Sequence, residues 1–479
     1  MTQKFTVIAS LTAALIPATT LIAKEKEKSP NLIIIMADQW RGDAIGYKGI
    51  EPVKTPNLDR MANEGVAFNQ AISSYPVSSP ARGMMMSGMY PFGNKVIGNC
   101  NSENTPYGVE LLKEAICWSD VLKDKGYSTG YIGKWHLDSP REPYIDCSNN
   151  KGGLAWNEWC EPSRRHGFTY WHAYGTYDSH LRPLYWDTNS ARNEFFYVDQ
   201  WGPEYETNKA IEFIKNQTSD KPYALVVSMN PPHTGYNLVP DKYKKLYTDL
   251  NTDLIAEANP AIPAKGTAMG NHFRKNVRDY YACISGVDEN IGRLIDYLKQ
   301  TNQFNNTIIV FSSDHGNCLG AHGEVTKNNY YEESMKVPFI ITYGKNIKPR
   351  IDTTTLIAFQ DIYPTVLSMM GFEKEIPKSV ETFNLASAVK GKSATLPEFQ
   401  PYYKINAKEP TSGWRGLRTL RHTYAVRYEK GKVVEKILFD RQTDPYELNN
   451  IVASQPKTEQ ELYKKLIAWL KKTSDPLAI

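Results

Sequence analysis

Continuous apolar runs alternate along the chain with segments whose apolar positions recur every three to four residues. The runs predict strands buried on both faces of a sheet, since a strand covered on one face only would alternate apolar and polar positions. These predicted strands are residues 31–38, 66–71, 127–133, 223–229, 307–313 and 337–342. The predicted helices are residues 55–65, 119–125, 205–215 and 281–298. Alternating strands and helices predict an α/β fold with a large, mostly parallel central sheet flanked by helices.

The pattern changes after Gly371. Strand-like segments are predicted at residues 417–428 and 434–439, with a turn at 429–431 between them. An amphipathic helix is predicted at residues 458–471. We therefore expect a larger domain over residues 30–371 and a smaller C-terminal α+β domain, with an antiparallel sheet, over residues 372–479.

The N-terminus has the pattern of an export signal. Lys4 precedes an apolar stretch over residues 5–16, and small residues follow over 18–23. This stretch is too short to cross a bilayer, and no later segment is apolar enough to be transmembrane. We expect a signal peptide over residues 1–23 and a mature protein in the periplasm or outside the cell.

Composition excludes some classes of function. The 479 residues carry a formal charge of +4, spread along the chain without the basic stripe of a nucleic-acid-binding protein. Six cysteines are compatible with disulfides in an exported chain. Cys147 and Cys160 flank a loop-like segment and are the predicted pair, and no Cys-x-x-Cys spacing indicates a zinc site.

Polar side chains follow four of the predicted strands at their carboxyl ends, which is the edge where open parallel sheets bind ligands. These residues are Asp38 and Gln39, Lys134 and His136, His233, and Asp314 and His315. Carboxylates, an amide, imidazoles and a lysine gathered at one edge predict a site for a cation together with an anion.

A short motif, Ser-x-Pro-x-Arg, occupies residues 78–82. It is accompanied by ADQ at 37–39, TPNLDRMANEG at 55–65, GKWHL at 133–137, NPPH at 230–233 and SSDHGNCLGAHG at 312–323. In this order the segments resemble the formylglycine-dependent sulfatases of the alkaline-phosphatase superfamily. The resemblance covers about residues 31–371 and, more weakly, the C-terminus. It implies an alkaline-phosphatase-like fold and hydrolysis of a sulfate ester.

The resemblance implies a nucleophile and a cation site. Ser78 is expected to be oxidised to formylglycine by a maturation enzyme, and the hydrate of this aldehyde to attack sulfur. One divalent cation, typically calcium in this family, is expected on Asp38, Gln39, Asp314 and His315.

The resemblance also implies roles for five further residues. Arg82 and Lys134 would steady the formylglycine hydrate, and His136 would accept a proton when sulfate leaves. His233 and Lys327 would bind the sulfate and assist the leaving oxygen. A sulfate monoester is an anion, so positive charge at these positions would lower the repulsion that a nucleophile meets.

Three positions bear on this assignment. Many relatives have two adjacent acids where this chain has Asp38-Gln39, and an asparagine where it has His315. Both changes weaken the argument for a hard cation, although calcium stays the first expectation. Ser78, in place of cysteine, resembles the substrates of anaerobic, radical-dependent maturation systems.

An aromatic-rich segment without a clean period, residues 140–201, lies between two site-bearing strands. Six of the ten tryptophans fall between Trp135 and Trp201. This loop should cross the active-site edge, where Trp171 or Trp186 could stack on a sugar ring, so we expect a sulfated carbohydrate substrate. Alternatively, these tryptophans pack the loop itself.

Two other functions stay open on the sequence. One is a phosphatase, phosphodiesterase or phosphonate monoester hydrolase of the same superfamily, which would share the metal ligands at the strand ends. The other is a non-catalytic glycan-binding homologue, which should lack members of the set, whereas every expected position holds a suitable residue.

Overall fold

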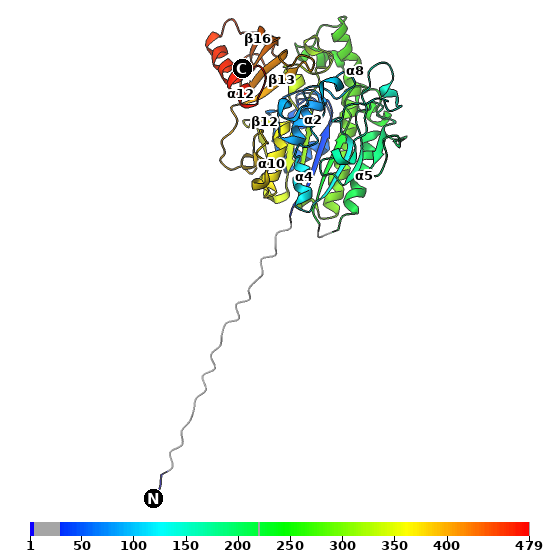
Figure 1. Cartoon of the computed structure of the whole chain (residues 1–479), viewed down its shortest axis with the longest axis vertical. Coiled ribbons are helices and arrows are strands. Elements are labelled where there is room, and N and C mark those ends of the chain that lie inside the picture. The colour runs from blue at the N-terminus through cyan, green and yellow to red at the C-terminus, as the bar shows by residue number, and fades with distance from the viewer. Residues whose placement is uncertain (4–28, 219–220, 479) are drawn as a thin grey trace.

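The computed structural model describes residues 1–3, 29–218 and 221–478 (Figure 1). Most of the predicted signal peptide therefore lies outside the described residues. None of the helices in the described part of the chain combines the length and the hydropathy that crossing a membrane requires.

Four parallel strands form the centre of a ten-stranded sheet, in the order β9-β1-β8-β4. They are β1 (Asn31–Ala37), β4 (Ser128–Lys134), β8 (Tyr223–Met229) and β9 (Thr307–Ser313). Because they are adjacent and parallel, their carboxyl ends meet at one edge. The predicted α/β fold is confirmed, and the strand ends that carry the polar residues are neighbours.

The outer strands make the sheet mixed. On one side lie β10 (Phe339–Thr342), β2 (Val66–Phe68) and β11 (Arg350–Asp352), and on the other β5 (Tyr170–Tyr174), β6 (Leu184–Asp187) and β7 (Phe196–Tyr197). β10 runs antiparallel to both of its neighbours. The predicted strand over 66–71 is too long, because β2 ends at Phe68 and β3 (Ala71–Ile72) pairs with β12 (Ile357–Ala358) in a separate sheet.

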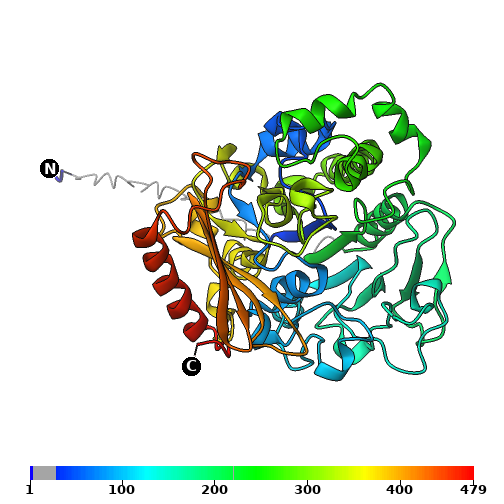
Figure 2. The same cartoon turned by 90° about the horizontal axis from the view of Figure 1, so that it is seen from above.

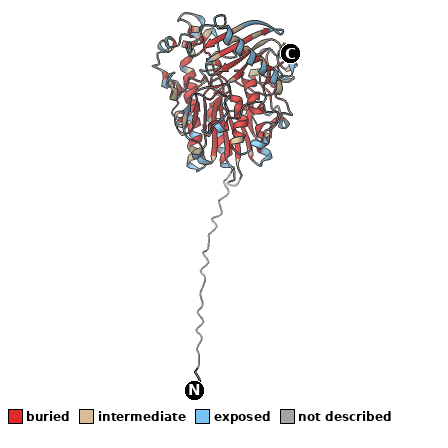
Figure 3. Ribbon diagram, turned by 90° about the vertical axis from the view of Figure 1, so that its left-hand side faces the viewer, coloured by how far each residue is buried: buried red, intermediate tan, exposed pale blue. Residues whose placement is uncertain are grey.

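Helices cover both faces of the sheet, which explains the continuous apolar runs. Successive side chains of β1 point to opposite faces: Ile33 and Ile35 pack into one core, and Leu32 and Ile34 into the other. The first core includes α1 (Pro56–Glu64), α5 (Gly202–Lys215) and α8 (Ala268–Gln300), and the second α2 (Ser78–Ser87), α4 (Trp118–Asp124) and α10 (Ile362–Met369). Figure 3 shows buried residues concentrated in these layers.

Helix α8 is longer than the predicted 281–298. It begins at Ala268, where the side chain of Thr267 caps the helix by accepting a hydrogen bond from the amide of Gly270. The short helices are α3 (Pro91–Asn94), α6 (Asp241–Lys244), α7 (Thr252–Ala258), α9 (Glu332–Met335) and α11 (Ala386–Val389).

The C-terminal part contains a four-stranded antiparallel sheet with α12 (Pro456–Lys472) against it (Figure 2). Its strands are β13 (Phe399–Ile405), β14 (Gly413–Thr419), β15 (His422–Glu429) and β16 (Lys432–Asp440). The single segment predicted over 417–428 is wrong, because the chain turns at Leu420 and Arg421 between two strands. The turn before β16 is confirmed, and Lys430 and Gly431 both have positive φ there. The domain boundary at Gly371 stays a prediction.

All six cysteines are buried and free. The predicted Cys147–Cys160 disulfide is therefore wrong for this structure. Each thiol has a different neighbour, since Cys147 Sγ accepts from Asn157 Nδ2 and Cys160 Sγ donates to the carbonyl of Glu161.

Candidate functional site

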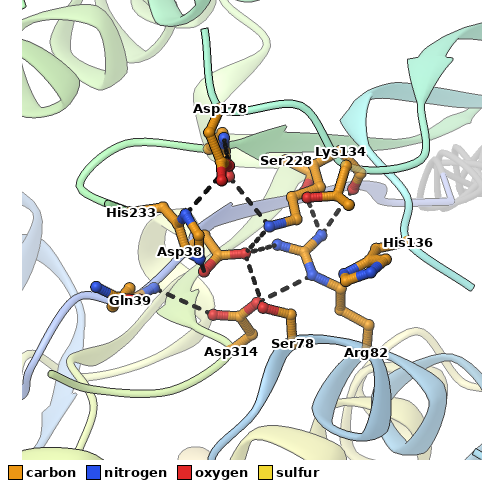
Figure 4. A network of polar contacts seen from close by, with 12 residues as sticks. Asp38, Gln39, Ser78, Arg82, Lys134, His136, Asp178, Ser228, His233 and Asp314 are labelled. Atoms are coloured by element: carbon orange, nitrogen blue, oxygen red, sulfur yellow. Dashed lines mark hydrogen bonds and ion pairs between the residues drawn. The ribbon is translucent and has the colours of Figure 1, made fainter. Parts of the chain in front are cut away.

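Ser78 is the first residue of α2, directly opposite the carboxyl ends of the central strands. Its Oγ lies 3.3 Å from Asp38 Oδ2 and 3.2 Å from His315 Nε2 (Figure 4). Arg82 follows one helical turn later, so the two side chains share a face of α2. The four-residue spacing in the Ser-x-Pro-x-Arg motif thus brings a hydroxyl and a guanidinium to one place, while Pro80 occupies the first turn, where no amide donor is needed.

The Arg82 guanidinium joins the ends of the central strands. Its Nε donates to Asp314 Oδ2 at 2.9 Å and its Nη2 to Asp38 Oδ2 at 3.0 Å. Nη1 donates to the carbonyl of Lys134 and to Ser228 Oγ, both at 2.7 Å. Arg82 is 1% exposed, so these contacts replace its hydration almost completely.

The two carboxylates differ in their electrostatics. Burial by itself would raise the pKa of Asp38, but Lys134, His233 and Lys327 together lower it well below its usual value. The Lys134 ammonium lies 2.7 Å from Asp38 Oδ2. Burial and the charge of Asp38 raise the pKa of Asp314. The charged forms of these two neighbouring buried carboxylates therefore depend on stabilisation by the basic side chains around them.

Asp38, Asp314 and His315 each offer a ligand atom, all within 4.8 Å of one another. His315 Nδ1 lies 2.9 Å from the carbonyl of Gly316, which can only accept, so Nδ1 carries the proton and Nε2 presents its lone pair. Asp38 Oδ1 and Gln39 Oε1 are buried without a hydrogen-bond partner among the described residues. Gln39 Nε2 donates to Tyr236 Oη at 3.0 Å, which fixes the orientation of its amide. These four side chains could hold a cation.

Two site residues have strained backbones. Gln39 follows β1 with a φ of 67°, and His136 follows β4 with a φ of 55°. Both angles lie in the left-handed region, which residues other than glycine seldom adopt. His136 Nε2 donates to the carbonyl of Cys100 at 3.1 Å, which leaves Nδ1 as a buried acceptor without a partner. Burial, and repulsion from Lys134 and Arg82, lower the pKa of His136 well below its usual value. A neutral imidazole with a free lone pair can accept a proton.

His233 and Lys327 form the other side of the cluster. Lys327 Nζ lies 2.9 Å from His233 Nε2 and 3.9 Å from Asp38 Oδ1. His233 Nδ1 lies 3.2 Å from Asp178 Oδ1. Burial, together with the charge of Lys327, lowers the pKa of His233 to about 4. The imidazole is thus neutral at pH 7.

Asp178 and Asn230 also belong to this cluster, although neither was predicted from the sequence. Asn230 Nδ2 donates to Asp178 Oδ1 at 3.1 Å, and Asn230 Oδ1 accepts from Lys134 Nζ at 3.2 Å. Asn230 opens the NPPH segment and could have been found there. Asp178 lies in the aromatic-rich segment, where no pattern distinguishes it.

The tryptophan prediction is corrected. Trp171 and Trp186 are 2% and 0% exposed, so neither can stack on a substrate, and the packing alternative holds for both. Trp171 stacks on Tyr131 with ring centroids 5.3 Å apart. Trp156 is partly exposed instead, with its ring centroid 6.3 Å from that of His136.

Comparison with known proteins assigns a family. The Sulfatase family profile matches residues 30–372, and a profile described as N-sulphoglucosamine sulphohydrolase, C-terminal, matches residues 320–475. The chain is 34% identical to an endo-4-O-sulfatase of Bacteroides thetaiotaomicron over 94% of both chains. It is 30% identical to an ulvan-active sulfatase of Formosa agariphila, covering 97% of this chain and 88% of that one.

Solved structures agree. The crystal structure of the yidJ protein of Bacteroides fragilis superposes with a TM-score of 0.93 at 59% identity, covering 96% of this chain and 99% of that chain. The predicted family and fold are thereby confirmed. The chain belongs to the sulfatase family and is a sulfuric ester hydrolase.

Proposed function

We propose that this sulfatase removes sulfate from a sulfated carbohydrate, using a formylglycine made from Ser78 and one divalent cation. The observation that carries the proposal is the position of Ser78 Oγ, 3.3 Å from Asp38 and 3.2 Å from His315. At this point two buried carboxylates and three basic side chains converge, which suits attack on an anionic ester.

The donor set fits a cation on Asp38, Gln39, Asp314 and His315. Asp38 Oδ1 and Gln39 Oε1 are ligand oxygens without a hydrogen-bond partner among the described residues, and His315 Nε2 presents a lone pair beside Ser78 Oγ. Three oxygen donors favour calcium, and the one nitrogen keeps other divalent cations open. When bound, the cation would offset the carboxylate charges and polarise a sulfate oxygen.

Position 78 suits a formylglycine nucleophile. The aldehyde hydrate would supply one hydroxyl to attack sulfur and a second whose deprotonation releases sulfate. Arg82 and Lys134 keep positive charge beside this position, and the N-terminus of α2 favours negative charge there. His136 Nδ1 is a free acceptor, so we assign His136 to take the proton as sulfate leaves.

Lys327 and His233 are assigned to sulfate binding and to the leaving oxygen. Burial, and repulsion from Lys134, lower the pKa of Lys327 to about 8. Lys327 is therefore mostly protonated near neutral pH, and its pKa is close to the value that suits proton transfer. Asp178 orients His233 through Nδ1, which leaves Nε2 toward Lys327.

A carbohydrate substrate is supported by the relatives and by Trp156. Relatives include the ulvan-active sulfatase and an N-acetylglucosamine-6-O-sulfatase of Bacteroides thetaiotaomicron that is 26% identical. Trp156 offers a partly exposed ring beside His136, where the sugar that carries the sulfate would lie. Export, proposed from residues 1–23, would give access to extracellular glycans.

The test is a panel of sulfated mono- and disaccharides beside nitrophenyl sulfate and nitrophenyl phosphate. We expect at least one sulfated sugar to be hydrolysed with a higher kcat/KM than the aryl sulfate, and the phosphate to be the poorest substrate. Faster hydrolysis of the phosphate, or turnover of the aryl sulfate with no sulfated sugar in a panel that spans sulfate positions, would contradict the proposal.

A further inference from the structure

A second basic site lies outside the cluster around Ser78. A groove of about 480 Å³ is lined by Lys336, Arg418, Arg421 and Arg441, and by Glu332 as the only acidic residue of its wall within the described chain. It separates α9 and the segment before β10 from the turns at the ends of β14 and β16. We call it the Arg441 groove.

Three of the four cations have a carboxylate of their own. Lys336 Nζ lies 2.9 Å from Asp43, outside the groove wall, and Arg421 Nη2 lies 2.6 Å from Asp440. Arg418 binds Glu332 in a bidentate manner, through Nε at 3.0 Å and Nη2 at 2.9 Å.

Arg441 only shares a carboxylate, in a longer ion pair. Its closest recorded carboxylate oxygen, on Glu332, is 3.7 Å from Nε and already binds Arg418. Glu447 lies nearby but accepts from Thr423 Oγ1 and from the amide of Glu332. Burial, and the charge of Glu332, raise the pKa of Glu447. Arg418 and Arg441 thus share the single carboxylate of the groove wall, which has four cations.

The same wall contains an unsatisfied donor. Arg418 is 2% exposed, and its Nη1 is buried without a hydrogen-bond partner among the described residues. Arg441 is held rigidly, because Nη1 donates to Thr423 Oγ1 and Nη2 to the carbonyl of Thr419, both at 2.5 Å. A buried charged donor without a partner is unfavourable, and planar guanidinium groups bind sulfate and carboxylate oxygens well. The wall therefore suits one oxyanion.

The Arg441 groove is close to the active site along the chain. The amide of Gly42 donates to the carbonyl of Lys336 at 2.8 Å. Gly42 comes three residues after Gln39, and three residues span at most about 10 Å. One wall of the groove is thus tied to the loop that carries the candidate cation ligands, so a glycan several sugars long could reach both places.

We propose that the Arg441 groove binds one sulfate or carboxylate group of the glycan chain whose sulfate ester enters the active site. The inference rests on the proposed carbohydrate substrate. It predicts that the enzyme favours longer polyanionic substrates over sulfated monosaccharides, because only the longer ones would contact both sites.

Binding is measured apart from turnover, on the Ser78→Ala full-length chain, by calorimetry with a sulfated glycosaminoglycan hexasaccharide and, separately, with a singly sulfated disaccharide. Leu420→Glu is the main variant, because Leu420 lines the groove and is 49% exposed, so a negative charge enters without removing a packed side chain. Arg441→Gln removes the guanidinium that shares Glu332 with Arg418. Arg427→Gln is the control, since Arg427 pairs with Glu435 elsewhere on the same sheet.

We expect both groove variants to weaken hexasaccharide binding about tenfold, the scale of a lost charge-assisted hydrogen bond, and to leave disaccharide binding unchanged. Arg427→Gln should bind like the parent. In the matured enzyme, in which Ser78 has not been replaced by alanine and is converted to formylglycine, Leu420→Glu should leave kcat/KM for nitrophenyl sulfate unchanged.

Unchanged hexasaccharide affinity in Leu420→Glu and in folded Arg441→Gln would overturn the groove assignment. Equal weakening of disaccharide and hexasaccharide would overturn it as well, because the effect would then act on the active site. Failure of the carbohydrate proposal itself would look different: the parent chain would turn over aryl sulfate but neither bind nor hydrolyse either oligosaccharide.

Discussion

Lys327 Nζ lies 2.9 Å from Nε2 of His233. The other ring nitrogen of His233 faces Asp178 at 3.2 Å, so the neutral imidazole can carry its proton on Nδ1 and accept from the lysine at Nε2. In this arrangement the proton between the two side chains belongs to Lys327. The pair therefore predicts a division of labour in which the lysine supplies the proton and the histidine orients it.

This division is tested with leaving groups of different basicity. Lys327→Arg keeps a positive charge but cannot give up its proton near neutral pH. We expect it to lower kcat on a sugar sulfate by about 100-fold or more, because a sugar alkoxide needs protonation, and to affect nitrophenyl sulfate much less. His233→Ala should show the same bias to a smaller extent. Equal losses on both substrates would mean that these residues only position the sulfate.

Removal of the cation should lower both activity and stability. Asp38 and Asp314 are buried side by side, and a bound cation stabilises such a pair. Exhaustive chelation should abolish turnover and lower the Tm, and readdition of calcium should restore both. Asp314→Asn should reduce metal content, measured by elemental analysis, more than Gln39→Ala, because it removes a formal charge. An unchanged Tm and unchanged activity after chelation would refute the cation site.

Modification of Ser78 is open to direct measurement. A tryptic peptide that contains residue 78, from protein made in the native host, should be lighter by two hydrogens and should react with a hydrazide probe. Ser78→Ala should bind the cation and a sulfated ligand but not turn over, because neither hydroxyl of the hydrate can form. Fully active enzyme with an unmodified serine would exclude the formylglycine mechanism and favour direct attack by the Ser78 hydroxyl.

Trp156 should affect sugars more than aryl esters. Trp156→Ala should raise KM for a sulfated sugar by about tenfold, the scale of a lost aromatic contact, and leave nitrophenyl sulfate nearly unaffected. Trp156→Phe, which keeps a ring, should retain most of the affinity. Trp159→Ala is the matched control, since Trp159 is also partly exposed but its indole nitrogen donates to the carbonyl of Ser190. A loss confined to the control would assign the sugar contact to Trp159.

The buried carboxyl group of Asp361 should make the stability of the fold depend on pH, independently of the active site. Burial raises its pKa from 3.8 to about 7, although it accepts hydrogen bonds from the amides of Ala358 and Phe383 and from Gln400 Nε2. Between these two values the folded chain holds a proton that the unfolded chain has lost. This contribution to stability is therefore full at low pH and is lost as pH rises from about 4 to about 7.

The variant Asp361→Asn should have a lower Tm and a shallower fall of Tm over this pH window, because the titrating group is gone. The Tm is measured at constant ionic strength, with Asp199→Asn as the control, since the Asp199 side chain is 83% exposed. A slope identical to that of the parent would show that Asp361 does not titrate in this range.

The centre of the fold and the location of the site follow from local patterns along the chain. Runs such as residues 32–37 are apolar at every position because both faces of the strand are covered, and this pattern does not depend on knowing the partner helices. Residues that end neighbouring parallel strands must share an edge, so Asp38, Lys134, His233 and Asp314 could be grouped before any coordinates existed.

Features that join distant segments depend on how the chain packs in three dimensions. Asp178 meets His233 across 55 residues, from a segment without periodicity, so no local pattern could reveal it. Trp171 and Trp186 lie in the same aromatic-rich segment as Trp156 but are buried, since exposure depends on the neighbours that fold over each ring. The sharing of Glu332 by Arg418 and Arg441 likewise depends on which carboxylates three-dimensional packing brings near. Local sequence patterns indicate which strands are buried and where they end. The partners of a side chain and the exposure of a single residue are set by contacts between residues far apart in the chain.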